Sequence, residues 1–516
     1  MQKESRVKKT MLNAKVNLLC YLASFITAFF TRKVLLDQLG TEFIGFTGTI
    51  GSILSFLNLA ELGIGTAISY VLYKPIANKD QFKINEVISV LGYLYKKIGY
   101  AILAGGVVLS FFLPIIFPNT SFPLGIVYIG FYTYLTASLI GYFVNYRAAL
   151  LSADQRNYIV TGYFQITTTS KVILQMVLAI YFGSFYIYLA IELSCGIINS
   201  IILNWKINQV YPWLKCNVKL GHKLLKKYPE IAKYTKQLFA HKIGHVFNEQ
   251  LTPIFIYAFV SLPIVALYSN YLIITQKIER TIGSVINSAG AAVGNLIAEG
   301  DKTKIIKTYK QFLSLRFMVA TVFSATIFKL STPFISIWLG NEYILPQIVV
   351  LQIAILSGMA MMRGVIDEFR FGFGIFSDIW APYVEISILT IVSTILGYKW
   401  GLYGVLCGPI VSIFIIVYIW KPYSLFKNGF KLSALIHWRI CCKYFLLSLI
   451  AFLIADKLYE TYIYADMKIT NWGTLIINSS LYVILITSIC LCLYLLSSKD
   501  FRDILNRVLK AKRNKH

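Results

Sequence analysis

Long apolar segments alternate with short polar connections along the whole 516-residue chain. About fourteen of these segments are long enough to cross a bilayer, since a spanning helix needs roughly 20 apolar residues. They cover residues 11–36, 43–72, 86–117, 124–145, 158–182, 186–207, 241–260, 264–298, 309–330, 345–370, 382–398, 402–420, 438–455 and 472–496. The pattern predicts an all-α polytopic membrane protein.

Composition and charge support this prediction and exclude a nucleic-acid partner. The chain is 57% hydrophobic and only 14% charged, which is more apolar surface than a soluble core can use. Its formal charge of +26 comes from Lys and Arg gathered in short segments between the apolar runs. The two termini and every second connection are basic, so both termini are expected in the cytoplasm, with an even number of spans.

The longest hydrophilic connection, residues 211–240, divides the chain. Six predicted spans precede it and six more follow in the same order and orientation. A faint similarity lays Ile44–Lys83 over Val265–Lys304, so that Asp80 meets Asp301. Parallel repeats of this kind place a substrate site between two halves. We therefore expect an N-lobe at 1–210, a basic cytoplasmic linker at 211–240, a C-lobe at 241–420, and two further helices with a basic tail at 421–516.

Charged residues lie in the middle of the apolar segment 264–298. Placing a charge at the centre of a membrane helix costs roughly 2.5–3.5 kcal/mol, so such charges usually face a wet cavity or a partner. On a helix, Lys277 and Arg280 share a polar face with Asn270, Ser284, Asn287 and Ser288. Alternatively, residues 252–276 form the span and Lys277–Arg280 end it. Loop polarity favours the first interpretation, because the second places basic loops on opposite sides.

Two short glycine-containing motifs carry a family resemblance. Leu39–Gly45 reads LGTEFIG and Glu61–Ala67 reads ELGIGTA. Glycine at such points permits a tight turn and close helix packing. This stretch resembles the amino-terminal signature of polysaccharide or O-antigen repeat-unit flippases (Wzx-type) of the multidrug/oligosaccharidyl-lipid/polysaccharide (MOP) exporter superfamily. Glu61 replaces the aspartate that is usual in the second motif.

The resemblance implies two six-helix lobes around a cavity and two extra helices. It implies alternating access, with a sugar repeat unit on polyprenyl pyrophosphate as the substrate, moved across the bacterial inner membrane for surface polysaccharide export. The chain would be a transporter and not an enzyme. Its partners would be the lipid-linked glycan, membrane lipids, and the polymerase and glycosyltransferases of the same pathway.

Buried cations suit a pyrophosphate, which needs compensating charge in a region of low dielectric constant. The candidates are Lys277, Arg280, Lys171, Arg32 and Arg316. For Lys277, Arg280 and Lys171, a snorkelling position at the membrane interface is the alternative. Arg32 could instead be an interface anchor, and Arg316 could lie at the surface. Arg363 also lies deeper in an apolar segment than a loop residue should.

Three acids within apolar segments are candidate H+ or Na+ coupling sites: Glu61, Glu192 and Glu249. Each of them could instead neutralise a buried Lys or Arg. His241 and His245 share a helical face, but a third metal ligand is not evident, so neither a metal site nor a cofactor is expected.

Other function classes remain open. A multidrug or small-molecule exporter of the same superfamily is one, although cationic drugs call for acidic cavities. An integral-membrane glycan polymerase or glycosyltransferase is another, although the outward loops are too short for a catalytic domain. A membrane scaffold would leave the buried charges unexplained.

Overall fold

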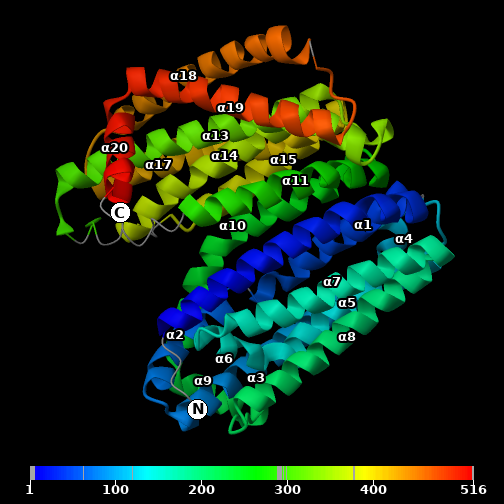
Figure 1. Ribbon diagram of the computed structural model, residues 1–516. Coiled ribbons are helices and arrows are strands. Elements are labelled where there is room, and N and C mark those ends of the chain that lie inside the picture. Colours follow the sequence, from blue (N-terminus) through cyan, green and yellow to red (C-terminus); the bar gives the residue numbers. More distant parts are fainter. Residues whose placement is uncertain are drawn as a thin grey trace. The chain divides into compact units, whose positions relative to one another are not determined.

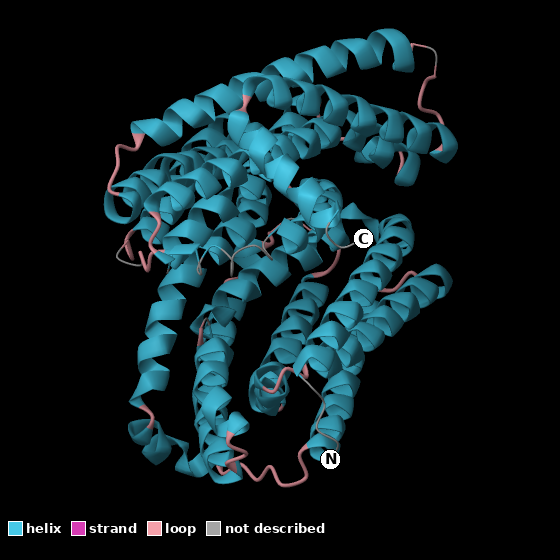
Figure 2. Ribbon diagram, turned by 60° about the vertical axis from the view of Figure 1, so that its left-hand side comes forward, coloured by secondary structure: helices cyan, strands magenta, loops and turns pink. Residues whose placement is uncertain are grey.

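The structure is a computed structural model that describes residues 6–513, apart from residues 62, 119, 287–292, 294–295, 298, 376–377 and 466; in parts of α1, α2, α10, α11 and α20 only the backbone is described. Figure 2 shows helices joined by loops, and none of the described residues forms a strand. Backbone contacts divide the chain into two compact units, Met1–Ala266 and Leu267–His516. Each unit is described by itself.

The first unit is a bundle of long helices with short ones at their ends. Its helices are α1 (Arg6–Leu57), α2 (Ile64–Ala77), α3 (Gln81–Ser110), α4 (Leu113–Ile116), α5 (Leu124–Phe143), α6 (Ala148–Ala153), α7 (Asn157–Phe182), α8 (Phe185–Val210), α9 (Gly221–Lys227) and α10 (Pro229–Phe259). α1 packs along α7, and α8 packs along both α5 and α7 (Figure 1). α10 packs against α1 and α2, so it belongs to this unit.

Glycines of the two sequence motifs mark the breaks in the first helices. α1 bends at Gly40, whose φ of 78° and ψ of 159° are not helical. Its last residues lead into a 3-10 turn, Asn58–Glu61, and Gly63 then adopts a left-handed φ of 93° before α2 begins. The span predicted over residues 43–72 is therefore interrupted, because this turn redirects the chain between α1 and α2.

The second unit begins within α11 (Leu262–Ile286) and ends in a helix that crosses the bundle. Its further helices are α13 (Lys302–Trp338), α14 (Gln347–Gly372), α15 (Ala381–Trp400), α16 (Leu402–Ile413), α17 (Lys421–Ser424), α18 (Leu435–Tyr459), α19 (Trp472–Ser497) and α20 (Lys499–Arg513). α16 and α17 join through a π-helical segment, Phe414–Trp420, and a second one, Leu425–Phe430, follows α17. α20 packs against α13 and α19 (Figure 1).

In the second unit, α15 and α16 pack closely against each other. A Cβ atom on Gly404 would lie 1.9 Å from the backbone oxygen of Leu396, and one on Gly408 would lie 1.9 Å from Oγ of Ser393. Small residues allow backbones to approach this closely in membrane helices. The Ser393 hydroxyl also donates to the backbone oxygen of Val405 at 2.9 Å.

Helix length and composition make the chain a multi-pass membrane protein. Within the part of the chain that is described, nine helices are long and apolar enough to cross a membrane. The remaining predicted spans fall on α1, α2, α7, α10 and α11. The predicted all-α polytopic fold is confirmed. The division into a 1–210 lobe, a 211–240 linker and a 241–420 lobe stays a prediction.

Candidate functional site

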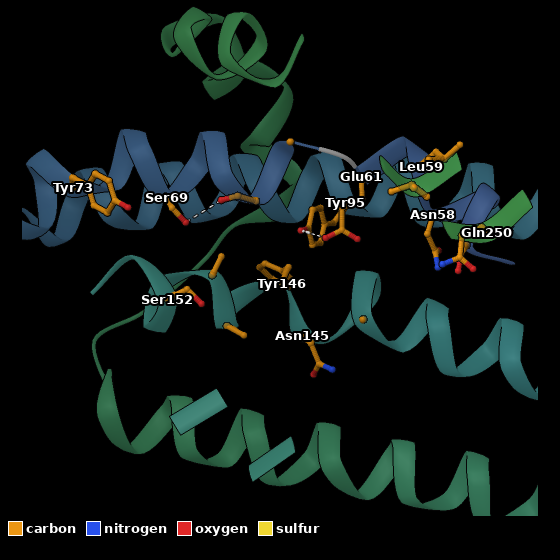
Figure 3. Close-up of a pocket in the computed structure, with 17 residues that line it drawn as sticks. Asn58, Leu59, Glu61, Ser69, Tyr73, Tyr95, Asn145, Tyr146, Ser152 and Gln250 are labelled. Atoms are coloured by element: carbon orange, nitrogen blue, oxygen red, sulfur yellow. Dashed lines mark hydrogen bonds between the residues drawn. The ribbon is translucent and has the colours of Figure 1, made fainter. Parts of the chain in front are cut away.

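A polar cavity of about 840 Å³ lies within the first unit (Figure 3). Its walls come from the end of α1, the 3-10 turn, α2, α3, the α5–α6 region and α10. The polar side chains that line it are Ser55, Asn58, Glu61, Ser69, Tyr73, Tyr95, Asn145, Tyr146, Ser152 and Gln250. The break at Gly63 is what brings the turn and α2 to this cavity.

Glu61 is the one charged side chain among the described residues that line the cavity. The hydroxyl of Tyr95 donates to Oε1 of Glu61 at 2.6 Å, and Figure 3 shows the two side chains side by side. The Glu61 side chain is half-buried. A carboxylate inside a membrane segment marks an ion or proton path by default.

Asn58 extends this polar network one turn away. Its Oδ1 accepts from the hydroxyls of Ser138 at 2.8 Å and Tyr142 at 3.1 Å. Amide and hydroxyl oxygens next to a carboxylate provide the hard oxygen ligands that small cations prefer. The cavity thus places the Glu61 carboxylate among hydroxyl and amide oxygens.

Lys171 and Glu192, which we predicted separately, form an ion pair between α7 and α8. Nζ of Lys171 lies 2.6 Å from Oε1 of Glu192, and Nε2 of Gln175 donates to Oε2 at 3.1 Å. Both charged side chains are largely buried. The pair matches the alternative that Glu192 neutralises a buried cation.

Arg32 is half-buried on α1, and its guanidinium donates to the backbone oxygen of Ala266 at 3.1 Å. The side chains of Glu249, His241 and His245 lie outside the described part of α10. Their predicted roles stay predictions.

Lys277 and Arg280 lie within α11 and do not end it. The helix continues through both residues to Ile286, with Lys277 half-buried and Arg280 exposed. Asn270 of the same predicted face is fully buried. The side chains of Ser284, Asn287 and Ser288 lie outside the described residues. That Lys277 and Arg280 line a cavity stays a prediction.

Arg316 is buried within the second unit, with 4% of its surface exposed. Its guanidinium donates to the backbone oxygen of Met361 at 3.0 Å and pairs with Glu368 at 3.2 Å. The guanidinium fits because residue 364 is a glycine. A Cβ atom on Gly364 would lie only 3.1 Å from Nη2 of Arg316. The charge of Arg316 is thus compensated by its own unit.

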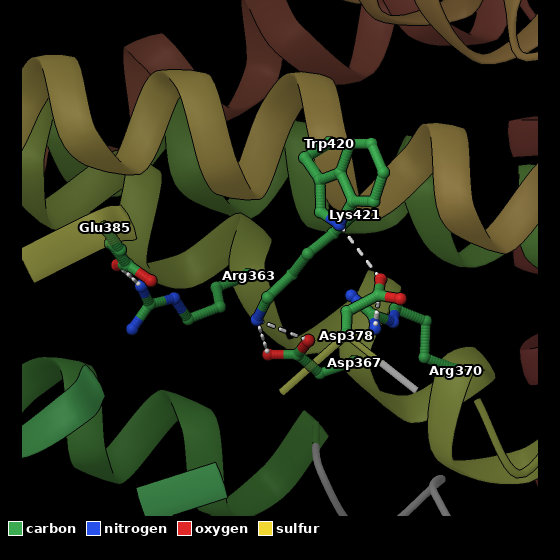
Figure 4. Close-up of polar contacts among 7 residues, drawn as sticks. All are labelled: Arg363, Asp367, Arg370, Asp378, Glu385, Trp420 and Lys421. Atoms are coloured by element: carbon green, nitrogen blue, oxygen red, sulfur yellow. Dashed lines mark hydrogen bonds and ion pairs between the residues drawn. The ribbon is translucent and has the colours of Figure 1, made fainter. Parts of the chain in front are cut away.

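A ladder of ion pairs, not predicted from the sequence, runs along α14 (Figure 4). Arg363 pairs with Glu385 of α15. Asp367 accepts from Lys421 of α17 at 2.7 Å, and Arg370 pairs with Asp378 at 3.0 Å. Spacings of four and three residues place these charges on one side of α14. The ladder ties α14 to α15 and α17.

Neutral cavity residues were also missed. Asn58, Asn145 and Gln250 lie in or beside predicted spans. An amide within an apolar segment is the signal that could have identified them.

The helices define a multi-pass membrane protein. Its fold is similar to those of two solved membrane proteins. The lipid II flippase MurJ, in an inward closed conformation, superposes with a TM-score of 0.66 at 14% identity, over 96% of this chain and 100% of that chain. An inward-facing multidrug resistance MATE family transporter of the MOP superfamily superposes with a TM-score of 0.56 at 13% identity, over 81% and 98%.

No family model matches the sequence, and no curated protein matches it either. The similarity to the two solved structures establishes the fold.

Proposed function

We propose that this protein is a flippase that moves polyprenyl-pyrophosphate-linked oligosaccharide repeat units across the bacterial inner membrane, for surface polysaccharide export. The observation that carries the proposal is the extent of the fold similarity. The lipid II flippase matches 96% of the chain, whereas the MATE transporter matches 81%. A fold match that takes in nearly the whole chain favours the lipid-linked class.

Two cationic side chains of α11 are the groups that we propose to bind the pyrophosphate. A pyrophosphate that crosses the membrane needs positive groups along its path. Lys277 and Arg280 lie three residues apart on a continuous helix, and Arg280 is exposed on its unit. In this proposal they contact the pyrophosphate, while Lys171 and Arg316 are compensated by Glu192 and Glu368.

Glu61 supplies the coupling site in the same proposal. Its carboxylate takes up H+ or Na+ in the polar cavity, and its charge state alters the hydrogen bond from Tyr95. A change in that bond acts on the junction of α1 and α2, which Gly63 leaves free to bend.

A leaflet-resolved assay tests the proposal. The purified protein is placed in liposomes with a polyprenyl-pyrophosphate oligosaccharide that carries a fluorophore on its sugar, and an impermeant reductant bleaches the outer leaflet. We expect wild-type protein to expose the whole lipid pool over time. Lys277→Ala/Arg280→Ala should slow this at least about tenfold, or 1.4 kcal/mol of activation free energy. Lys399→Ala, an exposed lysine on α15, is the matched control and should behave as wild type.

Two results would count against the proposal. If wild-type protein flips none of a panel of such lipids, the function is wrong. If the double variant flips at the wild-type rate, the function stands but these cations do not serve it.

Export of a cationic small molecule is the second candidate function. It is favoured by the cavity of the first unit, where Glu61 is the one charged lining residue among those described. Uptake of fluorescent cations into the same liposomes, sensitive to Glu61→Gln and with no lipid flipping, would support this alternative.

A further inference from the structure

We propose that the second unit binds the phosphate headgroup of an anionic phospholipid in a basic pocket between α17 and α18. The pocket has a volume of about 710 Å³. The residues that define it here are Lys427, Lys431, Ser433, Tyr423, Trp438 and Leu435. Its polar lining combines two ammonium groups with the hydroxyls of Ser433 and Tyr423, which is a suitable set of donors for a phosphodiester.

The two lysines are available for an anion. In the described part of the chain, neither Lys427 nor Lys431 forms an ion pair with a carboxylate. Lys427 lies 3.3 Å from the hydroxyl of Tyr423 and 5.5 Å from the centre of its ring. By contrast, Lys421, only six residues before Lys427, is bound to both carboxylate oxygens of Asp367. Among the described residues, the charges of Lys427 and Lys431 therefore have no carboxylate partner, whereas the charge of Lys421 does.

The backbone holds Lys431 in a defined position. Its φ of 56° is left-handed, which is uncommon for a residue other than glycine. The next residue, Leu432, donates its N–H to the backbone oxygen of Phe426 at 2.9 Å and so closes the end of the π-helical segment. The turn that carries Lys431 is therefore an ordered part of the unit.

The pocket lies where two spanning helices end. Leu402–Phe430 and Leu435–Tyr464 are both apolar enough to cross a membrane, and the pocket occupies the connection between them. The ends of spanning helices lie at the depth of lipid headgroups, where clustered basic residues recognise anionic lipids. The position of the pocket and its positive charge therefore both favour an anionic lipid headgroup as the ligand.

An apolar surface continues from the pocket along α18. Leu435 is 56% exposed, and Leu446 and Leu453 are each 57% exposed. Spacings of 11 and 18 residues from Leu435 place all three on one face of the helix. Acyl chains can lie along this face while the phosphate is held by the lysines. This continuity favours a whole phospholipid over a soluble phosphate.

Native mass spectrometry on the full-length protein, after reconstitution with equal amounts of phosphatidylglycerol and phosphatidylethanolamine, tests the site. We expect wild-type protein to retain phosphatidylglycerol in preference. Lys427→Gln/Lys431→Asn should lower this retention at least about fivefold, since each basic residue near an anionic lipid contributes on that order. Asn tolerates the left-handed conformation at 431, so the turn is kept.

Two further variants make the result decisive. Lys302→Gln removes an exposed lysine of the same unit outside the pocket, and Lys427→Arg/Lys431→Arg keeps both charges. Both should retain phosphatidylglycerol. The proposal is overturned if the Gln/Asn variant retains as much as wild type, if Lys302→Gln loses as much, or if neither lipid is preferred. Displacement by millimolar glycerol phosphate alone would also overturn it, in favour of a soluble phosphate. No flippase activity enters the measurement, so the result is independent of the proposed function.

Discussion

Asp80 and Asp301 accept the same hydrogen bond at the start of two helices that are 221 positions apart in the printed sequence. Oδ1 of Asp80 accepts from the backbone N–H of Lys83 at 3.0 Å, and Oδ1 of Asp301 accepts from that of Lys304 at 3.1 Å. Each Asp also forms an ion pair with the same lysine, at 3.4 Å and 3.3 Å. The two helices, α3 and α13, thus begin with the same cap.

The residues before the two caps match as well. Lys79 and Gly300 both have left-handed backbones, with φ of 55° and 79°. These are the positions that the faint repeat lays over one another. Shared backbone conformation and shared capping support the repeat where sequence identity is low.

The caps predict a loss of stability in acid. The hydrogen bond from the backbone N–H of Lys304 lowers the pKa of Asp301, and that from Lys83 lowers the pKa of Asp80. A carboxyl whose pKa is lowered by folding stabilises the folded protein fully at pH values above its unfolded-state pKa, which is about 3.9 for Asp. This stabilisation is lost as the pH falls through the folded-state pKa. Asp80→Asn/Asp301→Asn keeps an acceptor but removes the titration.

Thermal unfolding in detergent, followed from pH 7 to about pH 3, checks this prediction. The Tm of the double variant should fall less steeply with pH than that of wild type. Parallel curves would show that the two carboxylates do not contribute.

Glu61→Gln should abolish gradient-dependent transport without unfolding the protein. The amide fills the same space beside Tyr95 but cannot bind a proton or carry a charge. We expect the rate under an imposed H+ or Na+ gradient to fall at least about tenfold. Tyr95→Phe, which removes the 2.6 Å hydrogen bond alone, should have the smaller effect. Gradient dependence that survives in Glu61→Gln would exclude this residue as the coupling site.

Lys171→Met should destabilise the protein more than the double variant Lys171→Met/Glu192→Gln. Removing one partner of a largely buried pair leaves the other charge uncompensated, at a cost of roughly 3 kcal/mol. Chemical unfolding measures both variants. If the double variant regains stability and still flips lipid at the wild-type rate, Lys171 serves structure alone. If it is stable but inactive, the Lys171–Glu192 pair serves transport as well as structure.

Gly45→Ala should destabilise the first unit by about 3 kcal/mol or more, because an added Cβ would lie 1.9 Å from the backbone oxygen of Leu262. Gly51→Ala on the same helix meets nothing within 4 Å and is the matched control. The yield of monodisperse protein and its Tm distinguish the two variants. Equal behaviour would mean that α1 and the start of α11 can separate at no cost.

The sequence predicts the helices of this protein well because each spanning helix must satisfy its own backbone in lipid and therefore leaves an apolar run. The motif glycines were equally informative. Gly40 and Gly63 do occur where the backbone turns, and Gly45 at a close approach between helices. The interruption between α1 and α2 departs from the predicted spans, and α13 and the helical run Leu402–Phe430 extend beyond theirs.

The candidate site was predicted less completely. Glu61 was identified because a carboxylate in an apolar segment is conspicuous. Asn145 and Gln250 carry no charge and come from separate helices, so only the fold brings them to the same cavity. The ladder on α14 was missed for a related reason. Arg363, Asp367 and Arg370 have helical spacing, but their partners lie on other elements.

The close packing of α15 and α16 restricts how the second unit can change shape. With Gly404 and Gly408 pressed against the facing backbone, the two helices cannot slide past each other without a steric clash. The ladder adds α14 and α17 to the same block. Within the second unit, a change of shape would therefore move these four helices together as one block.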